Sequence, residues 1–528
     1  MPEYLSPGVY VEEVNRGARP IEGVGTAMAA FVGLAPAGPA NRAVLITSWS
    51  QYVETFGALD EGGRRNPHML GTYLSHAVHA YFLNGGGRCY VARVGAGARA
   101  AGSAASPPLP SVQLPSRSSN AVPSLTFTAQ SADQRDTQVD VMPSSVQEGG
   151  EALFTVRVKA GDTEETYENV SLGKRGVKNV VETVNQASRL VTVAEAQATG
   201  SIADRAPAAG TYVLKAVETA LIPALQSSDF VGDVAVRSGL EGLQVAEDVT
   251  MICCPDIMAA YQAGALDRDG VKAVQLGMIA HCERMGDRMA ILDPLPDLSP
   301  QEVQRWRERD AGYDSKFAAL YYPWVKIDAP NGQGSDRASR VIAVPPSGHI
   351  AGIYARNDTE RGVHKAPANE VVRGGLEPVI QVTKGEQDIL NPIGVNCIRS
   401  FTRGGLRVWG ARTLSSDPGW RYVNVRRLFN YVEKSIERGT QWVVFEPNDT
   451  DLWARVRRDV GAFLLGVWRD GMLFGSSPVQ AFYVKCDEEL NPPDVRDRGQ
   501  LVIEIGLAPV KPAEFVIFRV SQFAGGGA

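Results

Sequence analysis

The fold class of this 528-residue chain follows from three short apolar runs: DVTMICC at 248–254, RMAILD at 288–293 and FAALYYPWVKI at 317–327. Within each run apolar residues follow one another, without the alternation of a half-exposed strand. Continuous runs of this kind are typical of strands that helices cover on both faces, as in parallel sheets. The three runs therefore predict neighbouring strands in the interior of an α/β domain.

Helical patterns fill the two gaps between these runs. Residues 269–286 place apolar side chains three and four positions apart and end at Gly286, a residue suited to closing a helix. In the second gap, Ser299 and Glu302 form a capping box around Pro300, which favours the first turn of a helix. The order strand, helix, strand, helix, strand predicts a parallel sheet with crossover helices.

Mixed patterns continue on both sides of this region and predict a multidomain α/β and α+β protein. Residues 23–94 indicate buried strands and a helix. Residues 346–508 indicate an α+β domain, with amphipathic helices near 421–438 and 449–470 and a strand at 441–446 between them. The expected division is an arm at 1–22, a first core part at 23–94, a linker with a β-rich domain at 95–245, an α/β domain at 246–345, a C-terminal core domain at 346–508 and an arm at 509–528.

The segment 95–245 differs in composition from the rest of the chain. Residues 95–123, GAGARAAGSAASPPLPSVQLPSRSSNAVP, are mostly Ala, Gly, Ser and Pro, so we expect a linker there. Residues 125–222 are rich in strand patterns, and one run alternates from Phe154 to Val158, turns and alternates back. We therefore expect a separate β-rich domain that is inserted into the larger fold and faces outward.

Both ends of the chain carry a strand pattern without a nearby partner. YLSPGVYVEEV at 4–14 alternates, and the Gly- and Pro-rich stretch after it offers no second strand for a tight hairpin. EFVIFRVSQF at 514–523 also alternates and follows Pro509 and Pro512. A lone strand leaves its main-chain N–H and C=O groups unpaired, so each must join a sheet elsewhere. The residues expected to pair are Val9, Tyr10, Val11, Phe515, Val516, Ile517, Phe518, Arg519 and Val520.

Composition and charge exclude several classes of protein. Hydrophobic residues make up 44% and charged residues 21%, as in ordinary globular chains. A net charge of −6 without a long Lys/Arg run argues against nucleic-acid binding. No apolar window reaches about 18 residues, which argues against membrane insertion. The start Met1-Pro2-Glu3 does not resemble a secretory signal, and the cysteines form no CxxC pair, so we expect synthesis in a reducing cytoplasm.

The sequence lacks the common motifs of nucleotide and zinc sites, GxxxxGK[ST] and HExxH, and we expect neither a cofactor nor a bound metal. Two aspartates give the enzyme alternative. Asp256 and Asp293 follow the ends of two predicted parallel strands, where α/β sheets bind ligands, and two carboxylates there can hold Mg²⁺ for a metal-dependent hydrolase. The competing interpretation makes both of them loop and capping residues beside Pro255 and Pro294.

The second late helix has two different faces. One face is apolar and comprises Leu452, Val456, Val460, Phe463 and Val467. Roughly opposite lie Arg455, Arg458 and Arg469, with Asp451 on the same stripe. Such a stripe is either a solvated face or a surface that docks on an acidic partner.

Several long motifs together resemble one protein family. They are YLSPGVYVEEV at 4–14, FAALYYPWVKI at 317–327, VPPSGHIAGIYARNDTERGVHKAPANE at 344–370, LNPIGVNCIRSFTRGGLRVWGARTL at 390–414, WVVFEPND at 442–449 and LVIEIGLAPVKPAEFVIFRV at 501–520. The chain resembles the tail sheath proteins of contractile phages and of phage-like contractile injection systems. The likeness covers residues 1–94 and 246–528. Both halves of the sheath lie in one polypeptide, unlike the two-protein sheaths of type VI secretion. The insert and the ending resemble extracellular injection systems and R-type particles more than simple phages.

The resemblance implies a mechanical role rather than an enzymatic one. Sheath subunits form a homo-oligomer of stacked rings around an inner tube protein, and contraction drives the tube through a target envelope without using nucleotide. Baseplate and tail-terminator or cap proteins are the other expected partners, in a virion tail or phage-like particle. Family members link neighbouring subunits through both terminal arms. They touch the tube through a C-terminal region, where Arg455, Arg458 and Arg469 are the candidates.

Overall fold

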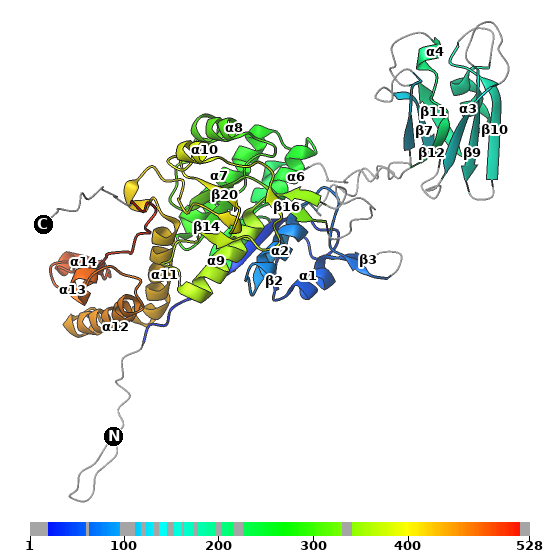
Figure 1. The fold of residues 1–528 in the computed structure, drawn as a ribbon. Coiled ribbons are helices and arrows are strands. Elements are labelled where there is room, and N and C mark those ends of the chain that lie inside the picture. The colour runs from blue at the N-terminus through cyan, green and yellow to red at the C-terminus, as the bar shows by residue number, and fades with distance from the viewer. Residues whose placement is uncertain are drawn as a thin grey trace, which may run out of the picture. The chain divides into compact units, whose positions relative to one another are not determined.

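The chain forms two compact units (Figure 1). One unit combines Met1–Gly97 with Ile222–Ala528, and the other is Ala98–Leu221. The computed structural model describes residues 20–59, 63–95, 111–117, 123–130, 137–144, 153–160, 163–173, 178–195, 202–214, 225–329 and 341–517.

A nine-stranded sheet forms the centre of the first unit. Its order is β18-β21-β20-β15-β14-β13-β1-β5-β2. From β20 through β5 all neighbouring strands are parallel, whereas β2, β21 and β18 pair antiparallel at the two edges. The strands are β18 Glu370–Val371, β21 Gly405–Val408, β20 Val395–Phe401, β15 Ala318–Tyr322, β14 Met289–Leu292, β13 Met251–Cys253, β1 Ala29–Gly33, β5 Cys89–Arg93 and β2 Ala43–Ile46. The predicted parallel sheet is therefore confirmed, and it also contains strands from residues 23–94 and from the C-terminal region.

Helices cover both faces of this sheet, which explains the unbroken apolar runs. Along β1, Ala30 and Val32 pack in one buried cluster with α6, α7 and α8, whereas Ala29 and Phe31 pack in a second cluster with α1, α2 and α9. The helices are α6 Asp256–Gln262, α7 Arg268–Met285, α8 Pro300–Arg305, α1 Trp49–Phe56, α2 Leu74–Leu83 and α9 Ser347–Arg361. Helix α7 ends at Gly286 in the left-handed conformation, and the capping box of α8 is formed, both as predicted.

The last part of the first unit forms a smaller helical block with its own buried cluster. Its elements are α11 Val423–Gly439, η5 Gln441–Val443, α12 Thr450–Arg469, α13 Pro478–Ala481, β22 Phe482–Lys485, α14 Pro493–Asp497 and β23 Glu504–Leu507. The strand expected at 441–446 is wrong, because this segment closes turns between the two helices. The Val443 N–H bonds to the Thr440 carbonyl, and the Glu446 N–H bonds to the Val443 carbonyl.

Short elements complete the first unit. They are β3 Ala58–Leu59, β4 Arg65–Asn66, α5 Ser227–Val231, η1 Glu241–Val245, η2 Trp306–Ala311, β16 Val325–Asp328, β17 Val341–Val344, β19 Glu377–Pro378, α10 Lys384–Leu390 and η4 Pro418–Trp420. None of the helices in the described part of the chain combines the length and the apolar character that crossing a membrane requires.

The second unit is rich in strands. A four-stranded sheet has the order β10-β9-β8-β12 and a three-stranded sheet the order β11-β7-β6. Their elements are β6 Ser111–Pro115, β7 Pro123–Ala129, β8 Gln138–Pro143, β9 Phe154–Ala160, β10 Thr163–Val170, α3 Val180–Ala187, β11 Val191–Glu195, α4 Ile202–Arg205 and β12 Gly210–Val213. Both sheets contribute to one buried cluster, which includes Phe127 and Phe154.

The structure places the borders of this unit differently from the sequence-based expectation. Strand β6 lies inside the expected linker 95–123, because Leu114 is fully buried and pairs with β7 despite the surrounding Ser and Pro residues. At the other end, Phe230 and Leu243 are buried in the main cluster of the first unit, so the segment 225–245 belongs there and not to the insert. The domain border expected near residue 345 does not divide the first unit. Strand β15 precedes this position and β20 follows it, and the two strands pair in one sheet.

Candidate assembly surfaces

The N-terminal arm meets the body of the protein at residues 20–28. Ile21 is buried and packs beside Gly439 at the end of α11. The Val24 N–H bonds to the Ser435 hydroxyl of the same helix at 3.1 Å. These contacts fix the segment that immediately follows the predicted arm.

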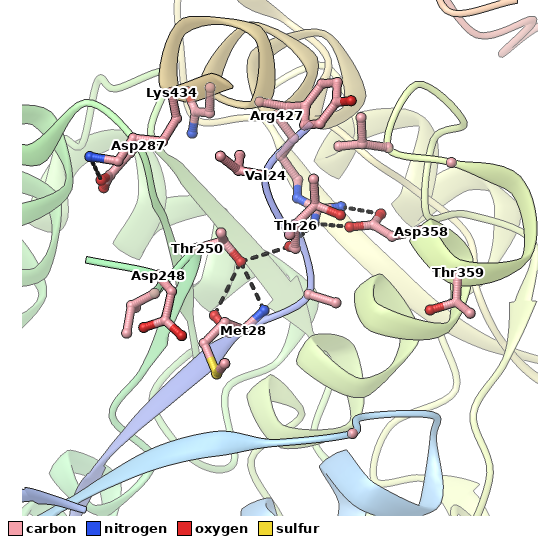
Figure 2. Close-up of a pocket in the computed structure, with 18 of the residues that line it drawn as sticks. Val24, Thr26, Met28, Asp248, Thr250, Asp287, Asp358, Thr359, Arg427 and Lys434 are labelled. Atoms are coloured by element: carbon pink, nitrogen blue, oxygen red, sulfur yellow. Dashed lines mark hydrogen bonds and ion pairs between the residues drawn. The ribbon is translucent and has the colours of Figure 1, made fainter. Parts of the chain in front are cut away.

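The next residues of this segment bond to the α/β body (Figure 2). The Thr26 carbonyl accepts hydrogen bonds from the Thr250 hydroxyl at 2.7 Å and from the Arg427 guanidinium at 3.0 Å. Arg427 also forms a bidentate pair with Asp358 at 2.8 and 2.5 Å, and each side chain of this pair is only 3% exposed. Paired buried charges of this kind hold two elements in register, because separating them leaves a charge without a partner.

A cavity of about 720 Å³ surrounds the same segment. Its lining includes four acidic and four basic side chains, and two ion pairs join some of them: Arg427 with Asp358, and Lys434 Nζ with the Asp287 carboxylate at 3.3 Å. Figure 2 shows Val24 and Thr26 crossing this cavity between α11 and the sheet. Equal numbers of acidic and basic side chains leave no excess of one charge there, and among the described residues no group of three His, Cys, Asp or Glu side chains is arranged to hold a metal ion.

The C-terminal arm meets the body at Glu514. One carboxylate oxygen accepts hydrogen bonds from Arg412 Nε at 2.8 Å and Asn391 Nδ2 at 2.7 Å. The other accepts from Arg412 Nη2 at 2.6 Å and from the Tyr422 hydroxyl at 3.0 Å. Burial raises the pKa of Glu514, but its hydrogen bonds to Arg412 and Asn391 outweigh this effect and hold the pKa below the usual range. Glu514 is therefore a charged anchor at neutral pH.

The arm residues beyond these two anchors are described only in part. Phe515, Val516 and Ile517 are 71%, 70% and 79% exposed and belong to no strand. The other six predicted pairing residues, Val9, Tyr10, Val11, Phe518, Arg519 and Val520, lie outside the described residues. Three consecutive large apolar side chains in solvent fit a segment that is covered in an assembly.

Strands β22 and β23 form a two-stranded antiparallel sheet in the C-terminal block. Val484 and Ile505 pack against the buried cluster below, whereas Tyr483 is 54% exposed. Among the described strands, neither β22 nor β23 has a second neighbour. Their outer edges therefore present main-chain groups that an added strand can pair with.

Helix α12 places the predicted arginines on its outer side. Its apolar face is buried as predicted, at Leu452, Val456, Val460 and Val467, with Phe463 half-buried. Arg458 and Arg469 are exposed, and Arg458 pairs with its neighbour Asp459 at 3.0 Å. Arg455 is half-buried, lies 3.5 Å from Glu446 and stacks over Trp442. The stripe is thus accessible at two of its three positions.

Asp256 and Asp293 are buried and bind main-chain groups. Asp256 accepts N–H bonds from Leu34 at 2.6 Å and from Tyr73 and Leu74, at the start of α2, at 2.5 and 3.2 Å. Asp293 accepts the Ser347 N–H, at the start of α9, at 2.8 Å. Burial raises the pKa of Asp256 to about 6 and that of Asp293 to about 7. Both residues fasten the helices on one face of the sheet to its strand ends.

Comparison with known proteins identifies the family. The model of the phage tail sheath protein central domain matches residues 240–414, and that of the phage tail sheath C-terminal domain matches residues 415–523. Together they cover more than half of the chain. The chain belongs to the phage tail sheath family. Its relatives are structural proteins, and it is a structural protein rather than an enzyme; the hydrolase alternative at Asp256 and Asp293 finds no support.

Curated relatives are tail sheath proteins of phages. The protein of Burkholderia phage BcepMu is 23% identical over 532 residues, which cover 97% of this chain and 95% of the relative. The protein of Vibrio phage KVP40 is 29% identical over 177 residues, so the match spans 33% of this chain and 26% of that longer relative.

Solved sheath structures have a similar fold over nearly the whole length. The sheath of an extracellular contractile injection system, PVC, in its contracted state is 25% identical with a TM-score of 0.54, and 99% of each chain is covered. The contracted helical sheath of the anti-feeding prophage is 23% identical with a TM-score of 0.59, and covers 99% of this chain and 100% of that one.

Sequence reasoning did not find the Glu514 anchor. Its partners Arg412 and Tyr422 lie 102 and 92 residues earlier in the chain. The available signal was a single acidic residue between the Pro509–Pro512 stretch and the apolar arm. An isolated charge at such a junction is ordinarily solvated, so only the fold shows its partners.

Proposed function

We propose that copies of this chain polymerise as stacked rings around an inner tube, and that contraction of this sheath drives the tube through a target envelope. The observation that carries the proposal is the match to the contracted PVC sheath over 99% of both chains. The inner tube protein, the baseplate and a terminal cap are its partners. The particle is a phage tail or a phage-like injection system, made in the bacterial cytoplasm.

The terminal arms link each subunit to its neighbours. The exposed run Phe515–Ile517 and the open edges of β22 and β23 support this, because a strand added to such an edge gains main-chain hydrogen bonds and a defined register. At about 3.3 Å per extended residue, the six residues 15–20 that precede the buried Ile21 can span roughly 20 Å. The arms would hold the subunits together while their bodies rotate and repack, and the repacking supplies the energy.

Helix α12 is the proposed contact with the inner tube. The exposed Arg458 and Arg469 and the partly paired Arg455 form a basic stripe that fits an acidic tube surface. The second compact unit, Ala98–Leu221, lies on the outside of the sheath in this proposal. It has its own buried cluster, as expected of a decoration that the ring contacts do not need.

Removal of residues 1–17 tests the arm linkage. The shortened chain should fold and stay monomeric, because the described contacts of the body begin at Ile21. It should form no sheaths, since one of the two linking strands is missing. Negative-stain microscopy and sedimentation would show this result, and the double change Val9→Pro and Val11→Pro should reproduce it because proline removes ladder donors. Normal contractile tubes from the shortened chain would exclude the arm as the link.

A further inference from the structure

Both arm anchors lie on one helix. The N-terminal segment is fastened to the second half of α11, through the Val24 bond to Ser435 and the packing of Ile21 beside Gly439. The C-terminal segment is fastened to the start of the same helix. The Asn424 amide, in the first turn, bonds to the Val510 carbonyl at 3.1 Å.

Glu514 is attached beside this end of the helix, through Tyr422 and through Arg412 and Asn391 of neighbouring segments. Tyr422 is the N-cap residue of α11, and its hydroxyl bonds to Glu514. Arg412, which holds both carboxylate oxygens of Glu514, lies on the strand-like segment whose main chain bridges to Tyr422. Charge-assisted bonds of this type are the stronger class of hydrogen bond. After Glu514 the described chain runs into solvent with three exposed apolar residues.

Helix α11 is itself rigidly fixed. Leu428 and Val432 of this helix are buried in the cluster of the C-terminal block. The ion pair of Arg427 with Asp358 joins the helix to α9 in the body. The attachments at Asn424 and Ser435 are 11 residues apart, which corresponds to about 16 Å along a helix. Because its main-chain hydrogen bonds are internal and its apolar side is buried, α11 keeps these two attachment points at a fixed separation.

We propose that α11 is a tie between the two arms of one subunit, and that Glu514 is the positioning residue that fixes the root of the C-terminal arm beside the start of this tie, through Tyr422, Arg412 and Asn391. The proposal rests on the proposed exchange of arms between subunits. Tension that enters through one arm leaves through the other along α11, so the α/β body can rotate without being pulled apart. Loss of the Glu514 bonds would let residues 509–514 peel away under load and lengthen the arm, although the pairing strand itself is unchanged.

The test compares Glu514→Ala with the matched control Glu308→Ala in the full-length chain. Glu308 is exposed on η2, and its described partner is the Gln304 side chain at 3.2 Å. Polymers of each variant would be passed repeatedly through a narrow needle, and tube lengths measured by electron microscopy. We expect Glu514→Ala tubes to be at least twofold shorter than wild type after the same shear, and Glu308→Ala tubes to be unchanged. Amide hydrogen exchange at residues 509–514 should be about tenfold faster in Glu514→Ala alone.

Thermal unfolding of the unassembled variants separates this role from a loss of fold stability. The proposal requires similar melting temperatures for wild type and Glu514→Ala together with unequal tube lengths. If Glu514→Ala does not fold, Glu514→Gln, which keeps the shape and one acceptor oxygen, takes its place with the same expectation. Equal lengths after shear would overturn the tie. Deletion of residues 515–528 tests the exchange of arms between subunits instead. If this deletion still gives polymers that resist shear, the proposed arm exchange is wrong, whatever the role of the Glu514 anchor.

Discussion

At the scale of one residue, the burial of Asp256 decides between two interpretations of its carboxylate: a ligand of a metal ion, or a group that binds the main chain. Its position after a parallel strand fits a ligand site, and the sequence alone left that alternative open. In the structure it is fully buried and accepts three main-chain N–H groups, two of them at the start of α2. The bonds lower its pKa, but the larger effect of burial raises it to about 6. The sequence could predict the position of Asp256 in the fold, but not its partners, because Leu34 and Tyr73 come from distant segments.

The raised pKa of Asp256 predicts a pH-dependent contribution to stability. The folded state keeps this proton up to about pH 6, whereas the unfolded chain releases it near 3.8. The contribution of the carboxyl to the free energy of unfolding is therefore complete below about pH 3.8 and is lost as pH rises through about 6. Compared with wild type, Asp256→Asn should be most destabilised near pH 4, and the difference should shrink by up to about 3 kcal/mol near pH 7.

Denaturant unfolding at several pH values measures this difference. The exposed Asp269 in the first turn of α7 provides the control, and Asp269→Asn is measured at the same pH values. A stability difference for Asp256→Asn that grows with pH would contradict the assigned direction of the pKa shift.

At the scale of helices and strands, the spacing of apolar residues predicted which face of an element is buried better than it predicted which residues that element contacts. The apolar face of α12 and the caps of α7 and α8 follow from local spacing, and the structure confirms them. The segment 441–446 has an apolar composition that suits a strand, but turn hydrogen bonds between two helices determine its conformation. The arm anchors could not be predicted, because each depends on bonds between residues that only the tertiary fold brings together.

The arginine stripe of α12 gives a prediction at this scale. Changing Arg455, Arg458 and Arg469 to Glu should weaken sheath loading on purified tubes by about tenfold or more, because like charges then face the tube surface that we propose to be acidic. Co-sedimentation with the tube measures this loading. A matched triple change on exposed residues elsewhere, Arg305→Glu, Arg309→Glu and Lys384→Glu, should leave loading unchanged. Equal loading of both triple variants would exclude α12 as the tube contact.

At the scale of the whole molecule, the parallel sheet was predictable and the extent of its unit was not. Three continuous apolar runs were enough to predict the central strands. The observed sheet contains more strands than these three, because β1, β5 and β20 join it from segments far apart in sequence. Composition placed the end of the insert too late, since the polar-looking segment 225–245 buries Phe230 and Leu243 in the main cluster.

Two deletions test the borders and the proposed role of the second unit. Replacing residues 98–221 by a short Gly/Ser bridge should leave a folded chain that still assembles and contracts, because that unit has its own core. Replacing 97–243 also removes Phe230, Leu240 and Leu243 from the main cluster, and should lower the melting temperature and the yield of folded chain. Loss of all tubular assembly in the shorter deletion would place the second unit among the ring contacts.

The central claim is that each subunit is linked to others by strands that its arms add to the sheet of β22 and β23. Cryo-electron microscopy of the polymers formed by the full-length chain, at a resolution that shows side chains, tests it most directly. If the arms link the subunits in this way, residues 8–14 of one copy and 515–520 of another will extend the β22–β23 sheet of a neighbouring copy. A two-stranded β22–β23 sheet in the polymer, with both arms folded back on their own copy, would contradict it.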